Sequence, residues 1–376
     1  FRGIINRGQP LVLLGNEGIP IPCKADHLFS FRDLTRHEVE KAYAGDIVAV
    51  SGPKNVSIGD TLADAATPEP LDRISIQEPT VKMTFGVNTS PFLGREGTNC
   101  TSRVLHERLI KELRTNVSLR IEETSSPDSF LVSGRGELQL AILVETLRRE
   151  KFEFQVSRPE PVTRYVDGYL HEPFEKLIIN TREEYVGQLT EYLAKHLARL
   201  TNMYYGDDGD VHMEYEIPTR GLIGFSSFFS KCTRGNGTKD TLFSDYRKLE
   251  GEIDNPSKGV LIASEGGIAV TYGLINAQGR GETFIEPGTP VYEGMIVGRH
   301  PREEDIAINV CKEKKLTNMR SSTADITKRL SPPVKMSLEE AIDFLSEDEL
   351  LEATPKNFRL RKRLLSATDR HRQRNK

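Results

Sequence analysis

The spacing of apolar residues between positions 78 and 156 predicts alternating strands and helices. Met83 and Phe85 alternate with polar residues, which is the period of a strand with one buried face. Leu105 and Leu109 recur four residues apart, which is the period of a helix. These two periods predict a strand at 80–87, a helix at 102–116, strands at 117–123 and 128–134, a helix at 136–151 and a strand at 152–156. This β-α-β-β-α-β order is the split βαβ, or ferredoxin-like, pattern.

A similar order follows between residues 157 and 251, and it predicts a second α/β sandwich. The expected elements are a strand at 173–180, a helix at 183–200, a strand at 211–218, a helix at 220–233 and a strand at 241–249. The apolar stripe of the first of these helices consists of Val186, Leu189, Leu193 and Leu197. Residues 201–210 are rich in Gly and Asp, so they are more typical of a turn than of the strand that the pattern requires.

Both ends of the chain are predicted to be mostly β. Residues 1–67 contain short apolar runs bounded by Gly and Pro, and the Pro-rich segment 66–73 that follows is a predicted linker. After residue 252, strands are expected at 259–275, 290–300, 305–311, 349–355 and 357–365. One helix is expected from Ser337 to Leu345, because a serine cap precedes an acidic first turn there.

These patterns predict a multidomain α+β protein. The predicted domains are a truncated β-barrel at 1–70, two ferredoxin-like α/β sandwiches at 76–156 and 157–251, and a mostly β domain at 252–376 with one helix and a basic protruding loop. The chain opens in what the pattern indicates is the middle of a strand, so we expect its natural N-terminus to lie further upstream.

The basic loop of the last domain is the most unusual local feature. Four cations, Lys312, Lys314, Lys315 and Arg320, stand against a single acid, Glu313. The residues between and after them are mostly small and polar: Thr317, Asn318, Ser321, Ser322 and Thr323. Ammonium and guanidinium groups neutralise phosphates, and amides and hydroxyls donate to phosphates or to a ribose 2′-OH. The loop is therefore either a solvated surface loop or a site for a polyanion such as RNA.

The charge distribution along the chain supports a polyanion as partner. The net charge is only −4, with 51 Lys and Arg against 55 Asp and Glu. From Lys356 to the C-terminus, however, nine residues are basic and only Asp369 is acidic. A basic end on a mildly acidic body indicates contact with a polyanion, and the alternative is a solvated tail.

Signatures of catalysis and of metal binding are missing from the sequence. It holds no G-x-x-x-x-G-K-[ST] loop, no G-x-S-x-G elbow and no H-E-x-x-H pair, so we predict no catalytic residue and no enzyme activity for these 376 residues. The four cysteines are far apart and without a C-x-x-C pair, which argues against zinc and suggests a reducing compartment. Apolar runs fall short of the roughly 20 residues that a membrane span needs, so no membrane partner is expected.

Several segments together resemble known translation factors. Residues 44–52, AGDIVAVSG, resemble the end of the second-domain barrel of translational GTPases. Residues 133–165 resemble the third domain of elongation factor G, and residues 216–229, EIPTRGLIGFSSFF, resemble a helix of its fifth domain. The segment 314–322, KKLTNMRSS, and the segment that begins SPPVKMSLEEAIDFL at residue 331 resemble the TypA/BipA family. The resemblance extends over almost the whole chain.

The resemblance implies a protein of the ribosome. Family members carry a GTPase domain followed by barrel, third, fifth and C-terminal domains. They bind the 70S ribosome and are linked to assembly of the 50S subunit and to growth in cold or under stress. GTP and Mg²⁺ would then be bound only by an N-terminal domain outside these residues. No cofactor is expected in the present chain, whereas the full-length parent would be a GTPase.

The same resemblance implies which residues touch RNA. The C-terminal loop would reach rRNA and the acceptor end of A-site tRNA. Residues carried over by position are Lys314, Lys315, Asn318, Arg320 and Ser321. Neighbouring or clustered polar and basic residues complete the predicted RNA-binding set: Lys312, Ser322, Arg220, Arg361, Lys362 and Arg363.

Two other interpretations stay open at this level. One is a stand-alone RNA-binding scaffold for ribosome assembly that reuses these domains without GTPase activity. The other is an enzyme whose site has no recognisable motif. We expect a monomer, located in a bacterial cytoplasm or in the matrix of an organelle.

Overall fold

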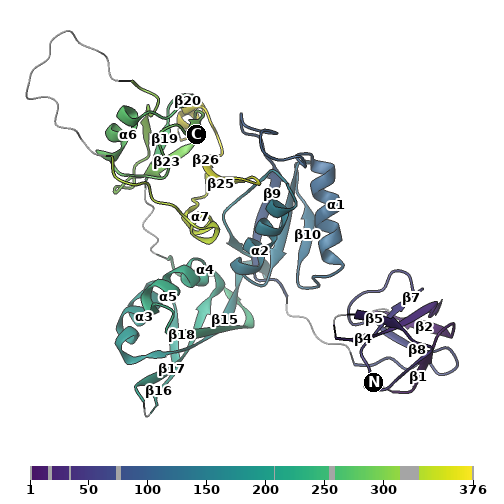
Figure 1. The fold of residues 1–376 in the computed structure, drawn as a ribbon. Helices are drawn as coiled ribbons and strands as arrows, with labels where there is room; N and C mark the ends of the chain where they lie inside the picture. Colours follow the sequence, from purple (N-terminus) through teal and green to yellow (C-terminus); the bar gives the residue numbers. More distant parts are fainter. Residues whose placement is uncertain are drawn as a thin grey trace, which may run out of the picture. The chain divides into compact units, whose positions relative to one another are not determined.

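A computed structural model describes residues 2–15, 19–33, 35–72, 78–206, 208–253, 259–313 and 330–374 (Figure 1). The chain divides into two compact units. Residues 1–76 and 111–117 form the first unit, and the remaining residues form the second.

The first unit is made of short antiparallel strands. They are β1 (Ile4–Asn6), β2 (Pro10–Leu14), β3 (Pro20–Lys24), β4 (His27–Arg32), β5 (Thr35–Glu38), β6 (Lys41–Tyr43), β7 (Val48–Ser51) and β8 (Thr61–Asp64). They pair as β1-β6, as β3-β2-β8 and as β5-β4-β7. The apolar run Leu11–Leu14 is buried along its whole length. These strands confirm the all-β prediction for the N-terminal segment.

The predicted β-α-β-β-α-β order is confirmed in the second unit. Its elements are β9 (Val81–Val87), α1 (Ser102–Leu113), β10 (Arg120–Glu123), β11 (Ser129–Gly134), α2 (Glu137–Arg149) and β12 (Phe154–Val156). The strands lie in the order β10-β11-β9-β12. Alternation places Met83 and Phe85 in the core, where the Phe85 ring stacks on Phe154 with centroids 6.0 Å apart.

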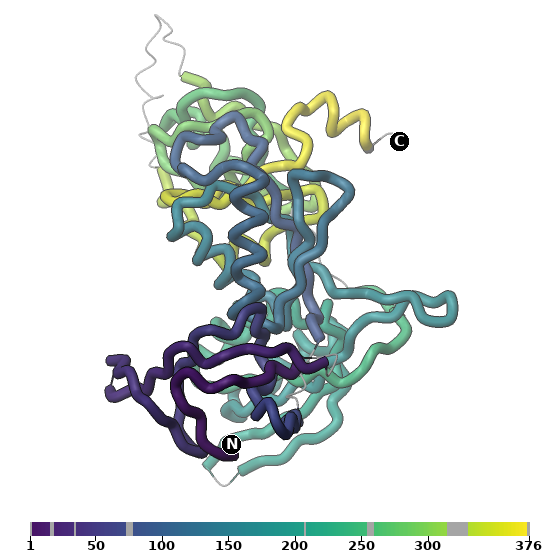
Figure 2. Tube along the Cα trace, turned by 90° about the vertical axis from the view of Figure 1, so that its right-hand side faces the viewer, coloured from purple at the N-terminus to yellow at the C-terminus, as the bar shows by residue number. Residues whose placement is uncertain are grey.

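A second sandwich follows, as predicted. It contains β14 (Arg164–Val166), β15 (Tyr169–Arg182), α3 (Glu183–Lys195), β16 (Arg199–Tyr205), β17 (Asp210–Pro218), α4 (Thr219–Leu222), α5 (Phe225–Thr233) and β18 (Gly237–Lys248). The sheet order is β14-β15-β17-β16, and β18 also pairs with β15. At one end of this sheet, β14 and the start of β15 form a short hairpin, seen as the projecting teal hairpin in Figure 2.

Two predictions in this sandwich were wrong in detail. The helix predicted at 183–200 ends at Lys195, and β16 occupies the first half of the segment predicted as a turn. This strand lies at the edge of the sheet and is almost entirely exposed, so its sequence lacks the alternation of a half-buried strand. The helix predicted at 220–233 is broken into α4 and α5 at Gly224, whose φ of 78° is left-handed.

The C-terminal segment contains more helix than predicted. Its elements are β19 (Val260–Ala263), β20 (Gly267–Ile268), α6 (Thr271–Gln278), β21 (Glu282–Thr283), β22 (Pro290–Val291), β23 (Ile296–Arg299), β24 (Ile306–Ile308), α7 (Leu338–Phe344), β25 (Glu349–Ala353), β26 (Phe358–Lys362) and α8 (Ala367–Arg374). In the described residues of this segment, three helices therefore stand where one was predicted. Only α7, with the expected capping box of Ser337 and Glu340, matches that prediction.

The last two strands belong to a sheet formed much earlier in the chain. β25 pairs with β12, and β26 pairs with β25, so the sheet becomes β10-β11-β9-β12-β25-β26, with β13 (Glu160–Pro161) paired to β9. All five residues of β25 are buried. The predicted domain at 252–376 is thus not separate from the predicted 76–156 domain. Its final hairpin, β25 and β26, completes the sheet of that earlier domain.

The glycine in α6 gives a test of how tightly this helix is packed. A Cβ on Gly273 would lie 2.2 Å from the Val310 carbonyl oxygen, so Gly273→Ala must displace backbone. We expect a loss of about 2–3 kcal/mol in the free energy of unfolding, measured by urea titration. Gly187→Ala in α3 is the matched control, since a Cβ there meets nothing within 4 Å and a helical Ala is favoured over Gly by up to about 1 kcal/mol. Equal stability of the two variants would contradict the close approach.

Candidate nucleic-acid interface

The basic loop begins on the core of the C-terminal domain. Val310 is buried in a cluster that includes Leu261 and Leu274, and its carbonyl accepts the Val270 N–H at 3.0 Å. Lys312 follows and is exposed. The remaining predicted contacts of this loop lie outside the described residues: Lys314, Lys315, Asn318, Arg320, Ser321 and Ser322.

The chain re-enters the same core after the loop. Leu330 packs against the cluster that contains Val310. Gln278, at the end of α6, holds Ser331 by both backbone groups: its Oε1 accepts the Ser331 N–H at 2.9 Å, and its Nε2 donates to the Ser331 carbonyl at 2.8 Å. Both ends of the connection between residues 311 and 330 are therefore fixed to one domain.

Lys362 is not a surface cation. Its side chain is only 3% exposed, and its Nζ lies 2.9 Å from Asp305, 3.0 Å from Asp348 and 2.9 Å from Glu349. Burial raises the pKa of Glu349, and the nearby ammonium opposes this shift. Three carboxylates around one ammonium leave no net positive charge to offer to a phosphate. The predicted RNA contact of Lys362 is contradicted.

Arg361 and Arg220 also serve the fold. The buried Arg361 guanidinium donates from Nη2 to Thr89 Oγ1 at 2.6 Å and to Gln155 Oε1. Arg220 donates from Nε to the buried Glu172 carboxylate at 2.7 Å, and from Nη2 to the carbonyls of residues 250 and 251. Both guanidinium groups are engaged in contacts within the protein, which argues against the predicted RNA contacts of Arg361 and Arg220.

Arg363 differs from its two neighbours because its side chain is exposed. Its Nη2 donates to the Glu347 carbonyl at 3.2 Å, a single neutral contact. Within the final hairpin, Arg363 therefore remains the cation of the predicted set that can reach a partner. With Lys312, it is one of two predicted contacts whose described side chains are exposed.

A buried carboxylate joins the final hairpin to the residues after β9. Glu352 is fully buried, and its Oε1 accepts from Arg359 at 2.8 Å and from Asn88 at 3.0 Å. Its Oε2 accepts the Tyr292 hydroxyl at 2.8 Å, and burial together with this carboxylate raises the pKa of Tyr292. Ser90 donates to Oε1 as well, at 3.0 Å. The charge of Glu352 is thus balanced by one cation and satisfied by three neutral donors.

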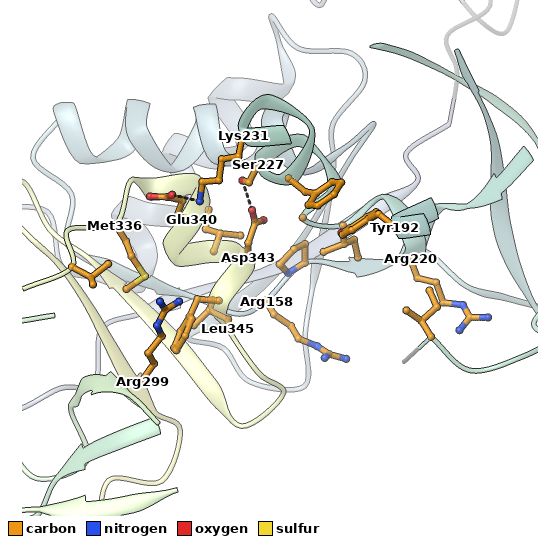
Figure 3. Close-up of a pocket in the computed structure, with 18 of the residues that line it drawn as sticks. Arg158, Tyr192, Arg220, Ser227, Lys231, Arg299, Met336, Glu340, Asp343 and Leu345 are labelled. Carbon is orange, nitrogen blue, oxygen red and sulfur yellow. Dashed lines mark hydrogen bonds and ion pairs between the residues drawn. The ribbon is translucent and has the colours of Figure 1, made fainter. Parts of the chain in front are cut away.

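A cleft of about 1010 Å³ lies within the second unit and has a basic rim (Figure 3). Its five cations are Arg158, Arg220, Lys231, Arg299 and Lys335. Each of them pairs with a carboxylate, for example Lys231 with Glu340 at 2.5 Å. Beside this pair, the Ser227 hydroxyl donates to Asp343 at 2.5 Å. The cleft therefore lacks the unbalanced positive charge of an anion site.

Two carboxyl groups meet where α2, α5 and α7 approach one another. Glu137 Oε2 accepts the Gly224 N–H at 2.8 Å. Burial raises the pKa of Glu137 to about 7, and the charge of Asp343 adds to this shift. Burial also raises the pKa of Asp343, whereas it lowers the pKa of the nearby Lys239 ammonium. The junction consequently holds one carboxyl group, that of Glu137, whose pKa lies near neutrality.

Neither a metal site nor a membrane span appears in the described part of the chain. No three His, Cys, Asp or Glu side chains among these residues are grouped so that they could hold a metal ion. The helices seen there are all too short or too polar to cross a membrane.

Family models match three parts of the chain. Residues 1–63 match elongation factor Tu domain 2, residues 169–256 match the elongation factor G C-terminus, and residues 258–367 match the TypA/BipA C-terminal domain. The large ribosomal subunit assembly factor BipA of Bacillus subtilis is 43% identical over 98% of this chain. The chain belongs to the TypA/BipA family.

Other members are similarly close. The BipA proteins of Haemophilus influenzae and Synechocystis are 45% and 44% identical, over 99% and 96% of this chain. The chain spans about three fifths of the length of these curated relatives. It matches the family from the second domain to the C-terminal domain, and its 376 residues hold no GTPase domain.

The buried polar residues of this TypA/BipA chain were missed from the sequence. Glu137 and Asp343 lie on amphipathic helices and Glu352 lies on a fully buried strand, and none of them belongs to a recognisable motif. One signal was available: an acidic run, 347–352, is followed by the basic run 359–363 across a short turn. Opposite charges at the two sides of a predicted hairpin indicate pairing with each other, which competes with any RNA.

Replacement of the two neighbouring cations Lys362 and Arg363 tests their different roles. Lys362→Ala leaves three carboxylates without their shared ammonium, so we expect it to lower the free energy of unfolding by about 3–5 kcal/mol. Arg363→Ala removes an exposed charge and should change the free energy of unfolding by about 0.5 kcal/mol or less. Guanidinium titrations of both variants at pH 7 give the comparison. A neutral effect of Lys362→Ala would show that the buried cluster does not stabilise the fold.

The junction of α2, α5 and α7 should make stability depend on pH. The folded-state pKa of Glu137, about 7, lies above its ordinary value of 4.5, so the folded chain binds this proton more tightly than the unfolded chain. The free energy of unfolding should therefore fall as pH rises from about 4.5 to 7, by at most about 3 kcal/mol.

The Glu137→Gln variant should lose this dependence and be more stable than the wild type at pH 8. Thermal unfolding at pH 5.5 and pH 8 measures the effect. Glu145→Gln on the same helix is the control, because Arg148 and Arg149 hold the pKa of Glu145 near 2, outside this window. A drop between the two pH values that is the same in Glu137→Gln and the wild type would exclude Glu137 as its cause.

Proposed function

We propose that this chain is the ribosome-binding part of a translational GTPase that acts in assembly of the large ribosomal subunit. The name of its relatives, large ribosomal subunit assembly factor BipA, supports this function. So does the match of residues 258–367 to the C-terminal domain of that family. The proposed partners are the 70S ribosome and the 50S subunit, and the proposed physiological role includes adaptation to cold or stress.

The single observation that carries the RNA contact is the anchoring of the basic loop. Val310 and Leu330 fix both of its ends on one core, and the four cations of the segment lie between these anchors in sequence. Lysine and arginine at such a position can neutralise phosphates with little competition, since Glu313 is the only carboxylate between Val310 and Thr323. The proposed ligands are rRNA and the acceptor end of A-site tRNA. The proposed contacts are Lys312, Lys314, Lys315, Asn318, Arg320, Ser321, Ser322 and Arg363.

The GTPase activity is proposed for the whole protein only. A domain outside these 376 residues would bind GTP and Mg²⁺ and would control docking through its nucleotide state. The present chain has no phosphate-binding loop, so we expect it to bind ribosomes without turning over nucleotide. We further propose that it acts as a monomer in a bacterial cytoplasm or an organelle matrix.

Co-sedimentation with 70S ribosomes across a salt series tests the loop. We expect the triple variant Lys314→Ala, Lys315→Ala, Arg320→Ala to bind more weakly than the wild type. The slope of log affinity against log salt should become flatter by roughly one unit for each lost phosphate contact.

A control variant removes three exposed cations elsewhere: Lys41→Ala, Lys54→Ala and Lys111→Ala. Weaker binding and a flatter slope in the loop variant alone support the proposal. Equal slopes for wild type and loop variant would refute the loop as the RNA contact. If the chain does not bind at all, the experiment is repeated on the full-length protein with GTP, where failure to bind would refute the ribosomal function itself.

A further inference from the structure

Helix α6 lies against both ends of the connection that carries the basic loop. At the entry to this connection, the Val270 N–H donates to the Val310 carbonyl, and Gly273 lies so close to this carbonyl that there is no room for a Cβ. At the exit, Gln278 in the last turn of the helix binds Ser331. One helix of eight residues therefore fixes both the point where the chain leaves the domain core and the point where it returns.

The contact at the exit is a strand-like pairing made by a side chain. The Gln278 amide accepts the Ser331 N–H and donates to the Ser331 carbonyl, so it binds the backbone donor and acceptor of one residue together. Its Nε2 also donates to the Thr283 hydroxyl at 3.2 Å, and Thr283 is buried. Nε2 carries two hydrogens, which suffice for these two bonds. An amide bound on both sides in this way has little freedom to turn.

The surroundings of Gln278 are rigid as well. Just after the helix, a Cβ on Gly281 would collide with the Arg299 carbonyl in β23, so the end of α6 lies directly against the sheet. Beyond Ser331, the Val334 N–H donates to the Thr283 carbonyl at 2.8 Å. The position of Ser331 is thus defined by the sheet of the C-terminal domain through Gln278.

Fold stability alone does not account for the contact between Gln278 and Ser331. Ser331 is exposed, so its N–H and carbonyl could bind water instead, and such a hydrogen bond contributes little net free energy to folding. The contact does fix the position of the chain directly after the loop, next to Leu330, which packs against the core. Fixing the ends of a loop in advance reduces the entropy that is lost when the loop binds a partner.

We propose that Gln278 is a positioning residue for the RNA contact: by binding Ser331 it fixes the exit of the basic loop relative to its entry at Val310, which lowers the ordering cost when the loop cations bind rRNA. The inference rests on the proposed function, since the loop must be the RNA contact if its placement is to matter. Gln278 acts through the loop and not by touching RNA. Its removal should therefore weaken binding without removing a phosphate contact.

Gln278→Met removes both hydrogen bonds to Ser331 and keeps an unbranched side chain of similar length. In co-sedimentation with 70S ribosomes, we expect up to about ten-fold weaker binding, with an unchanged slope of log affinity against log salt because every loop cation is still present. Gln139→Met on α2 is the matched control. Its Oε1 likewise accepts a backbone N–H, that of Arg135, and its Nε2 donates to the Ser118 hydroxyl. This control should bind like the wild type, and unfolding midpoints verify that both variants fold.

Combination with the loop variant decides whether Gln278 acts through the loop. When Lys314→Ala, Lys315→Ala and Arg320→Ala are present, addition of Gln278→Met should change the affinity by less than about two-fold. Equal losses in both backgrounds would show that Gln278 acts through the fold, and this would overturn the inference. The measurements use the chain, or the full-length protein with GTP if only that form binds.

The remaining outcomes separate this inference from the proposed function. Wild-type affinity of Gln278→Met beside a weakened loop variant would overturn the positioning role alone and leave the loop contact standing. Wild-type affinity of the loop variant itself would refute the loop contact, and the inference would fail with it.

Discussion

The carboxylate of Glu352 is the interaction on which the second unit depends. It is fully buried in β25. It accepts hydrogen bonds from Arg359 of β26, from Asn88 and Ser90 after β9, and from Tyr292 of the C-terminal domain. Taking such a charge out of water is costly unless every acceptor site is satisfied, so the three segments must be in place together. The pairing of β25 with β12 therefore requires that the hydrogen-bond donors around Glu352 are in place as well.

This requirement also explains how the basic loop is held. The loop leaves and re-enters a core that contains Tyr292, and Tyr292 donates to Glu352. The core to which the loop is attached is therefore held by a hydrogen-bonded network of charged and polar groups. The loop sequence itself has few large apolar side chains that could pack against the domain. Several basic residues of the C-terminal domain, such as Arg299, Lys335 and Lys362, are likewise paired with carboxylates of the protein itself.

Periodicity predicted both sandwiches, because their strands and helices bury one face each and show it in the sequence. It missed β16, an exposed edge strand, and α6, whose helix depends on Gly273 fitting against Val310. The charge pattern predicted the candidate site less well. Arg361 and Lys362 have the composition of a surface patch. The acidic run at 347–352 could have indicated Asp348 and Glu349 as partners of Lys362, but Thr89 and Gln155, the partners of Arg361, lie 272 and 206 positions away, which no local pattern can indicate. Periodicity alone indicated the domains but not their function. The resemblance to the family supplied the order of the domains and the function that this order implies.

The late position of β25 has a consequence for biosynthesis. Phe154 pairs with Ala353, so about 200 residues must be translated between the two strands. At roughly 5–20 residues per second, the edge of β12 remains unpaired for about 10–40 s on the nascent chain. An open strand edge is a template for pairing with other chains. The sheet that supports the candidate RNA-binding domain is therefore completed only after residue 353 has been translated, and until then the edge of β12 is open to pairing with other chains.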